Sequence, residues 1–170
     1  MTEAHPFKPF VPKKAKYLLL GSFVALRNDN TYDWYYGKKV NQFWPIIESV
    51  YKVKLPGKKE RQALFKKLKM AVTDIIIKCE RKTNNSMDNS LINCVYNLPR
   101  IKKILKENNI VEIFFTSKYV EKEFKKRFKE LIEKYPQINM VTLPSPSPRY
   151  ASISIKEKIR RYMKLLPDLQ

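Results

Sequence analysis

At 170 residues the chain is long enough to bury one core and too short for two ordinary domains, so we expect a single domain. Its hydrophobic share of 44% and aromatic share of 12% exclude a disordered tail or a low-complexity array. Lys and Arg number 35 against 16 Asp and Glu, and this net charge of +19 favours a polyanionic partner, with a merely solubilising surface as the alternative.

A Pro-rich lead segment, residues 1–15, precedes the domain expected over 16–170. The apolar block 16–23 ends in Gly21-Ser22-Phe23 and is typical of a buried parallel strand. Helical spacing of apolar residues then predicts two helices. One begins near Asn41, and the other carries Leu64, Phe65, Leu68, Ala71 and Val72.

The second half of the chain repeats this alternation of strand and helix. Residues rich in β-branched and aromatic side chains predict strands at 72–78 and 110–116, with a helix between them. A long basic helix over 118–135, a strand at 138–143 and a closing helix follow. The order is β, α, α, β, α, β, α, β, α.

Such alternation predicts a mostly parallel α/β sheet that is covered by helices on both faces. Ligands of these sheets bind beyond the carboxyl ends of the strands. Four segments follow predicted strands and are expected to share one cleft: Gly21–Phe23, Lys78–Arg81, Thr116–Lys118 and Pro144–Pro148.

The segment that follows the first strand combines polar and aromatic groups. The Asn41 amide can hydrogen-bond a water and a sugar or base edge, while Tyr36 and Phe43 are expected to sandwich a flat base. The alternative is structural: Asn41 caps the next helix, and Phe43 and Trp44 anchor the core.

The run 143–151 follows the fourth strand and is rich in Pro and Ser. Its restricted backbone presents Ser145 and Ser147 to a phosphate group, with Arg149 beside them. A stiff turn with no ligand is the alternative.

Taken together and in order, these motifs resemble the uracil-DNA glycosylase superfamily, especially its hypoxanthine-DNA glycosylase-like and mismatch-specific branches. The resemblance runs from about Tyr17 to Ala151. It rests on five stretches: Leu19–Phe23, Tyr36-Gly37 with Asn41-x-Phe43-Trp44, Asp74–Arg81 with Ser86–Asp88, Ile113–Ser117, and Pro144–Pro148.

The resemblance implies a three-layer α/β/α sandwich with a four-stranded parallel sheet. It also implies a monofunctional glycosylase that flips a deaminated base out of DNA and hydrolyses its glycosidic bond without metal or cofactor. Asn41 would orient the water. The base pocket would comprise Gly21, Ser22, Phe23, Tyr36, Gly37, Phe43 and Ser117, and the DNA contacts Arg81, Lys118, Ser145, Ser147 and Arg149.

The chain also departs from the family pattern. Uracil-specific members carry an Asp in the first motif and a His in the last loop, whereas this sequence has neither there, and its one histidine, His5, lies in the lead segment. The mismatch-specific branch has an Asn where Phe23 stands, and Val24 replaces a Pro. These departures predict slow catalysis and make hypoxanthine a serious substrate beside uracil.

The sequence also raises three other functions. The chain could be a catalytically silent DNA-binding protein with a glycosylase fold. It could instead be a metal-dependent nuclease that uses Asp74, Glu80 and Asp88, although local ion pairs explain these residues more simply. A dinucleotide-binding enzyme is disfavoured, because three glycines do not supply a phosphate loop.

Two cysteines, Cys79 and Cys94, and the lack of a secretory signal predict an intracellular protein of the cytoplasm or nucleoid. No apolar run is long enough to span a membrane, and no partner subunit is required, so a monomer is expected. The basic face of the helix over 118–135 is expected to be solvated and to contribute electrostatic field rather than contacts.

Overall fold

The computed structural model describes residues 1–25 and 32–169. Its centre is a four-stranded parallel sheet in the order β3-β2-β6-β7. The strands are β2 (Tyr17–Gly21), β3 (Met70–Asp74), β6 (Glu112–Phe115) and β7 (Asn139–Thr142). Leu19, at the middle of β2, lies opposite Val72 and Phe114, so the central strand is buried between two parallel neighbours.

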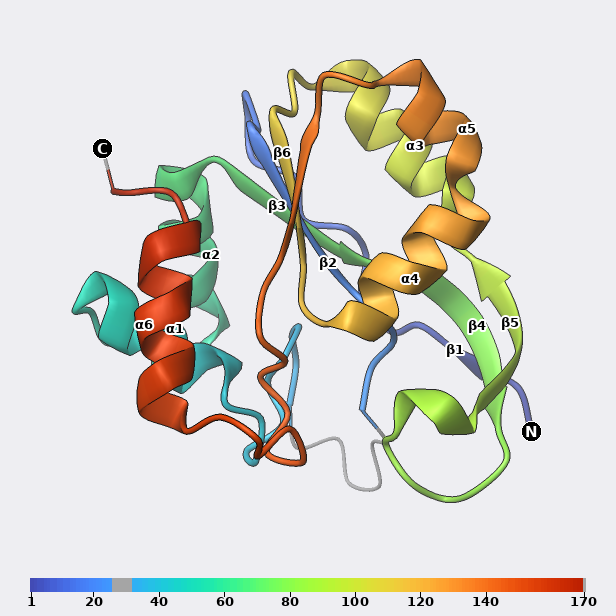
Figure 1. Cartoon of the computed structure of the whole chain (residues 1–170), viewed down its shortest axis with the longest axis horizontal. Coiled ribbons are helices and arrows are strands. Elements are labelled where there is room, and N and C mark those ends of the chain that lie inside the picture. The colour runs from blue at the N-terminus through green and yellow to red at the C-terminus, as the bar shows by residue number, and fades with distance from the viewer. Residues whose placement is uncertain (26–31, 170) are drawn as a thin grey trace.

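Helices cover both faces of this sheet (Figure 1). Helices α1 (Phe43–Tyr51), α2 (Lys58–Leu68) and α6 (Ile155–Leu165) lie on one face. Helices α3 (Leu98–Glu107), α4 (Lys118–Arg127) and α5 (Lys129–Lys134) lie on the other.

Side chains alternate across β2 as a pleated strand requires: Leu18 and Leu20 join the core under α3 to α5, while Leu19 joins the core under α1, α2 and α6. The predicted three-layer sandwich with a four-stranded parallel sheet is confirmed.

A second, smaller sheet was not predicted. It is antiparallel and contains β1 (Glu3–Ala4), β4 (Ile76–Arg81) and β5 (Leu91–Tyr96), with a 3-10 turn, η1 (Asp88–Ser90), before β5. The prediction of a single strand over 72–78 is therefore wrong, because the chain leaves the parallel sheet after Asp74 and enters the second sheet at Ile76.

Asn97 holds this bend. Its side-chain amide donates to the backbone oxygen of Asp74 at 2.8 Å, and its backbone N–H donates to Ile75 at 2.8 Å. The bend lies inside the β-prone run 70–77, which has no Gly or Pro, so the sequence pattern does not mark it.

Two predicted helices have different limits in the structure. Helix α2 ends at Leu68, because Lys69 adopts a left-handed φ of 54°, and Ala71 and Val72 belong to β3. The long basic helix is interrupted at Phe128, whose ring stacks on Phe124 with centroids 4.8 Å apart. Within the described residues no helix combines the length and apolar character needed to cross a bilayer.

The lead segment is bound to the rest of the fold by backbone hydrogen bonds. Strand β1 pairs antiparallel with β4, so that Glu3 lies opposite Cys79. Further along, Phe10 and Val72 exchange two backbone hydrogen bonds at the edge of the parallel sheet. This pairing brings the intervening residue, His5, to the carboxyl end of β3.

Candidate functional site

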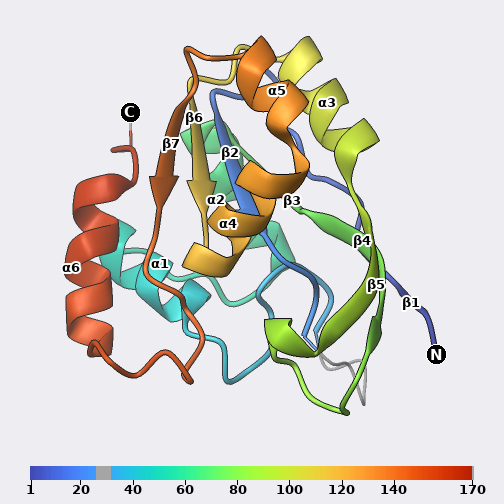
Figure 2. The same cartoon turned by 45° about the vertical axis from the view of Figure 1, so that its right-hand side comes forward.

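A cleft of about 660 Å³ lies beyond the carboxyl ends of the parallel strands, where ligands of such sheets bind. In Figure 2 strands β2, β6 and β7 run downward, and the segments that follow them gather below the sheet. The walls of the cleft are aromatic and polar. They are formed by residues 22–25, 32, 35, 36, 38, 40, 41, 74, 86–89, 116, 117, 119 and 145–150.

Three of the four predicted segments meet at this cleft, after β2, β6 and β7. The fourth, Lys78–Arg81, does not line it, because those residues form β4 of the second sheet. The connection between β4 and β5 contributes Ser86 to Asn89 in its place.

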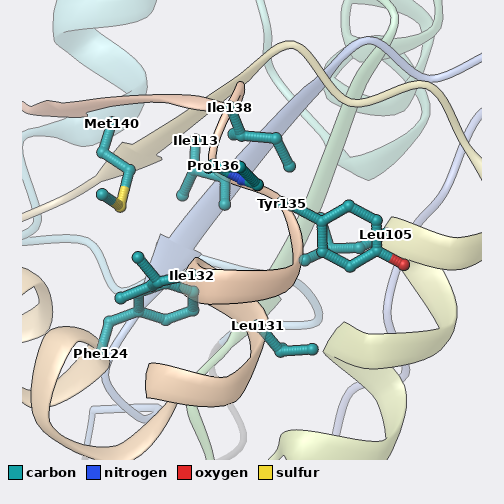
Figure 3. Close-up of a pocket in the computed structure, with 9 residues that line it drawn as sticks. All are labelled: Leu105, Ile113, Phe124, Leu131, Ile132, Tyr135, Pro136, Ile138 and Met140. Atoms are coloured by element: carbon teal, nitrogen blue, oxygen red, sulfur yellow. The ribbon is translucent and has the colours of Figure 1, made fainter.

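A second pocket, between α3, the α4–α5 pair and the sheet, has a volume of only about 30 Å³ (Figure 3). Its lining is mainly apolar, with Leu105, Phe124 and Ile138 among the side chains that surround it. A space of this size is a packing gap rather than a site for a base, so the larger cleft is the candidate functional site.

Asn41 lines the cleft and lies just before α1, whose N-cap residue is Gln42 rather than the predicted Asn41. Its Oδ1 accepts the backbone N–H of Phe43 at 2.8 Å, and its own N–H donates to Lys38 at 2.8 Å. These bonds fix the side chain at the rim of the cleft. This turn uses one lone pair of Oδ1 and leaves the side-chain NH₂ for a ligand.

The predicted sandwich of a base between Tyr36 and Phe43 is not formed. The two rings contact each other, with centroids 4.4 Å apart, and leave no room for a base between them. Phe43 is 1% exposed and belongs to the core. Tyr36 remains at the cleft, and Phe23 lines it as the sequence predicted.

The predicted glycines support the cleft rather than line it. At Gly37 a Cβ would lie 2.9 Å from the backbone oxygen of Trp34, so only glycine fits there. At Gly21 a Cβ would meet the side chains of Asp74 and Tyr36. Ser22 and Ser117 do line the cleft, and Ser117 also caps α4 by accepting the N–H of Val120 at 3.2 Å.

The Pro-Ser loop forms one wall, with Ser145, Ser147 and Arg149 all at the cleft. Its shape is held by side-chain turns, because Ser145 Oγ accepts the N–H of Ser147 at 3.2 Å and Ser147 Oγ accepts the N–H of Arg149 at 3.3 Å. Arg149 is exposed.

Lys158 of α6, which is 1% exposed, supports this loop from behind. Its Nζ donates to Gln42 Oε1 at 2.8 Å and to the backbone oxygen of Ser147 at 3.1 Å. Burial lowers the pKa of this ammonium group. No sequence pattern predicts this buried lysine, because a lysine on a basic helix is expected to face solvent.

Arg81 is not available as the predicted DNA contact. Its guanidinium donates to Glu3 Oε1 at 2.9 Å, to the backbone oxygen of Val24 at 2.7 Å and to that of Asn85 at 3.1 Å. The side chain is 5% exposed, so it braces the segments beside the cleft. Lys118, the first residue of α4, is exposed but lies outside the cleft lining.

The residue pair that sequence reasoning missed is His5 and Asp74. His5 Nε2 lies 2.8 Å from Asp74 Oδ2, and both side chains are at most 5% exposed. Asp74 ends β3 and lines the cleft. Sequence spacing does not link these residues, because His5 lies in the lead segment and Asp74 lies 69 residues later. The pairing of β1 with β4 brings them together.

Asp88 is a second carboxyl group at the cleft. It accepts the hydroxyl of Ser22 at 2.5 Å, and burial raises its pKa even though this hydrogen bond acts in the opposite direction. Glu80 instead accepts Asn93 at 3.1 Å on the second sheet. Within the described residues no three His, Cys, Asp or Glu side chains form a group that could hold a metal ion.

Comparison with known proteins identifies the fold. No protein-family model matches the chain, and no curated protein sequence matches it either. Among solved structures, the chain resembles the solution structure of a candidate uracil DNA glycosylase from Methanosarcina acetivorans, with a TM-score of 0.64 and 16% sequence identity. The match covers 97% of this chain and 99% of that one, so the two proteins share the fold over their whole length.

Proposed function

We propose that this protein is a monofunctional DNA glycosylase that excises a deaminated base, hypoxanthine or uracil, in base excision repair. The observation that carries the proposal is the cleft, which lies at the carboxyl end of the sheet in a fold shared with a candidate uracil DNA glycosylase. Its volume of about 660 Å³ lies within the range of small-ligand sites. It is large enough for a base with its sugar.

The walls of the cleft suit an extruded nucleotide. Phe23 and Tyr36 offer aromatic surface to a base, and the NH₂ group of Asn41 can donate to a water or to the sugar. Arg149 is exposed at the rim beside the Pro-Ser loop, where it can contact a phosphate. The net charge of +19 supplies a general attraction to DNA.

In this account the glycosidic bond breaks early, and the sugar develops positive charge as the base leaves with the electron pair. A water held by Asn41 attacks the anomeric carbon. Extrusion costs a few kcal/mol and is easiest at a mispair, which favours deaminated bases over correctly paired ones. We further propose that the protein acts as a monomer inside the cell.

The proposal is tested by single-turnover base release on duplexes that carry uracil or hypoxanthine opposite each normal base. Asn41→Ala is assayed beside the wild type, with Asn139→Ala, whose side chain bonds Glu112 away from the cleft, as the matched control. We expect release by the wild type and the control and none by Asn41→Ala. DNA binding without release by the wild type would favour a silent binding protein.

A further inference from the structure

Asp88 keeps one carboxyl oxygen available to a ligand in the cleft. Its Oδ1 accepts the Ser22 hydroxyl at 2.5 Å. Its Oδ2 has no hydrogen-bond partner among the described residues, and it is not one of their enclosed side-chain atoms that lack a partner. Since Asp88 lines the cleft, this oxygen reaches the space in which a ligand would bind.

Asp74 also lines the cleft, but it offers no such oxygen. Its Oδ2 is held by His5 Nε2 at 2.8 Å, and its Oδ1 is enclosed by the surrounding protein. A base in the cleft therefore meets the carboxyl group of Asp88 and not that of Asp74.

The backbone around Asp88 holds its side chain in a fixed place. Asp88 begins η1, and its backbone oxygen accepts the N–H of Leu91. The buried Ser90 closes the same turn, because its hydroxyl and its backbone N–H both donate to the backbone oxygen of Met87, at 2.6 and 3.0 Å. A group held in this way suits selective binding, since it does not shift to accommodate a wrong ligand.

Asp88 and the Pro-Ser loop belong to different walls of the cleft. Figures 1 and 2 both show the green turn η1 and the orange-red loop after β7 well apart, on two sides of the lower part of the molecule. Asn41 lies on the side of the loop, because the N–H of its neighbour Gln42 donates to Pro146 at 2.9 Å. A nucleotide whose sugar and phosphate lie at Asn41 and Arg149 therefore directs its base toward Asp88.

Deamination changes the hydrogen-bonding character of one ring nitrogen. In adenine N1 and in cytosine N3 this nitrogen is an acceptor, whereas in hypoxanthine and uracil the same nitrogen carries a hydrogen. An ionised carboxylate only accepts hydrogen bonds, so it bonds the N–H of a deaminated base and repels the lone pair of the parent base. One carboxylate at this edge of a flipped base therefore separates both deaminated bases from their parents.

We propose that Asp88 Oδ2 accepts this ring N–H and is the specificity-determining group of the cleft, with Ser22 as its positioning residue. The inference rests on the proposed glycosylase function and adds how hypoxanthine and uracil are distinguished from adenine and cytosine. The Ser22 hydroxyl holds Oδ1, which leaves Oδ2 as the oxygen for the base. A site that bonds an N–H strongly rejects a base without one, because its own polar group is then left unpaired.

The surroundings of Asp88 are consistent with a ligand N–H. Burial raises the pKa of this carboxyl group, the Ser22 hydroxyl lowers it, and the nearby Asp74 raises it further. A donated N–H acts in the same direction as the Ser22 hydroxyl, because it stabilises the charged form. A deaminated base thus favours the ionised carboxylate that binds it, whereas the lone pair of adenine or cytosine does not.

The test uses the full chain and measures the single-turnover rate of base release and the Kd for each duplex. The duplexes carry hypoxanthine or unsubstituted purine, which lacks the N1 hydrogen and the neighbouring carbonyl group. Uracil and 2-pyrimidinone form the equivalent pair of pyrimidines. We expect the wild type to release hypoxanthine or uracil at least about tenfold faster than the matching analogue and to bind its duplex more tightly.

Asp88→Asn keeps the shape of the side chain, and the Ser22 hydroxyl still bonds Oδ1, so an NH₂ group replaces Oδ2. We expect release of hypoxanthine or uracil to fall about 10- to 100-fold while release of the analogue stays within about threefold. A merely structural role would lower both rates alike. Glu80→Gln, which changes a carboxylate bonded to Asn93 on the second sheet, is the matched control and should keep the wild-type preference.

A preference in Asp88→Asn within about threefold of the wild-type value would overturn the inference, even where Asn41→Ala abolishes release and supports the glycosylase. Equal rates for base and analogue in the wild type would also overturn it. If Asp88→Asn does not fold, Asp88→Ala decides by the same comparison.

Failure of the proposed function is distinguished by the Kd values. If the wild type releases no base, the glycosylase proposal is wrong. Tighter binding of the hypoxanthine or uracil duplex than of the analogue duplex, lost in Asp88→Asn, would then still support base recognition by Asp88. Equal binding of the two duplexes would overturn this recognition as well.

Discussion

Lys158 Nζ lies 3.1 Å from the backbone oxygen of Ser147, so that a buried ammonium group on the last helix fixes the loop at the edge of the cleft. The same nitrogen donates to Gln42, next to Asn41. One side chain therefore holds two walls of the cleft, at Gln42 and Ser147, which lie 116 and 11 residues from Lys158 in the sequence.

Lys158→Met should loosen the Pro-Ser loop while leaving the sheet intact, since Met fills similar space without the two hydrogen bonds. We expect faster amide exchange over residues 145–149 and a base-release rate reduced roughly 10- to 100-fold, because small displacements of site residues are costly to catalysis. Lys156→Met, an exposed neighbour on α6, is the control. Unchanged exchange in the loop would contradict this role.

Gly21→Ala should distort the cleft by displacing the side chains of Asp74 and Tyr36. The added methyl group meets Asp74 Oδ1 and the Tyr36 hydroxyl, neither of which can move without breaking the surrounding packing. We expect a loss of about 1–3 kcal/mol in the free energy of unfolding, measured in urea, and loss of base release. Gly57→Ala should be tolerated, because a methyl group there meets only the flexible end of Glu60 at 3.2 Å.

Arg81 and Arg149 should respond to substitution in opposite ways. Arg81→Met removes a buried guanidinium bonded to Glu3 and Val24, and should lower the free energy of unfolding by about 1–3 kcal/mol without changing the salt dependence of DNA binding. Arg149→Gln should keep stability but weaken DNA binding and reduce the slope of log K against log salt by about 1. A reversed pattern would contradict both assignments.

Asp88 should make stability depend on pH. Burial raises its pKa in the folded protein above its ordinary value of 3.8. Between the unfolded and folded pKa values the native state binds more protons, so stability falls as the pH rises through this window. The Asn side chain of Asp88→Asn cannot ionise, so this variant does not lose stability in that pH window. Its stability relative to wild type, from urea unfolding, should rise as the pH increases above about 4, and a constant difference would contradict the burial effect.

The sequence predicted the parallel sheet well, because apolar strands such as 16–23 and helices with one apolar face carry periodic signals that tertiary packing preserves. It did not predict the second sheet. The bend at Ile75 depends on a hydrogen bond from Asn97, which lies 22 residues later and has no local signature. The limits of α2 depended on the left-handed Lys69, which is also unmarked in the sequence.

The candidate site was predicted where residues follow strands, as with Ser22, Phe23, Ser117 and the Pro-Ser loop. It was missed where long-range pairing decides the position. His5 reaches Asp74 only because β1 adds to β4, and Arg81 is withdrawn from the surface by bonds to Glu3 and Val24. Ring packing of Tyr36 on Phe43 likewise replaced the expected base sandwich, since two adjacent aromatic residues can bury each other instead of a ligand.

The central claim is tested most directly by incubating excess wild-type protein with a duplex that carries one hypoxanthine or one uracil and measuring the free base released. The account predicts free hypoxanthine or uracil, with one alkali-labile abasic site per base and no strand cleavage before alkali treatment. Intact duplex that remains bound to the protein, with no free base, would contradict it.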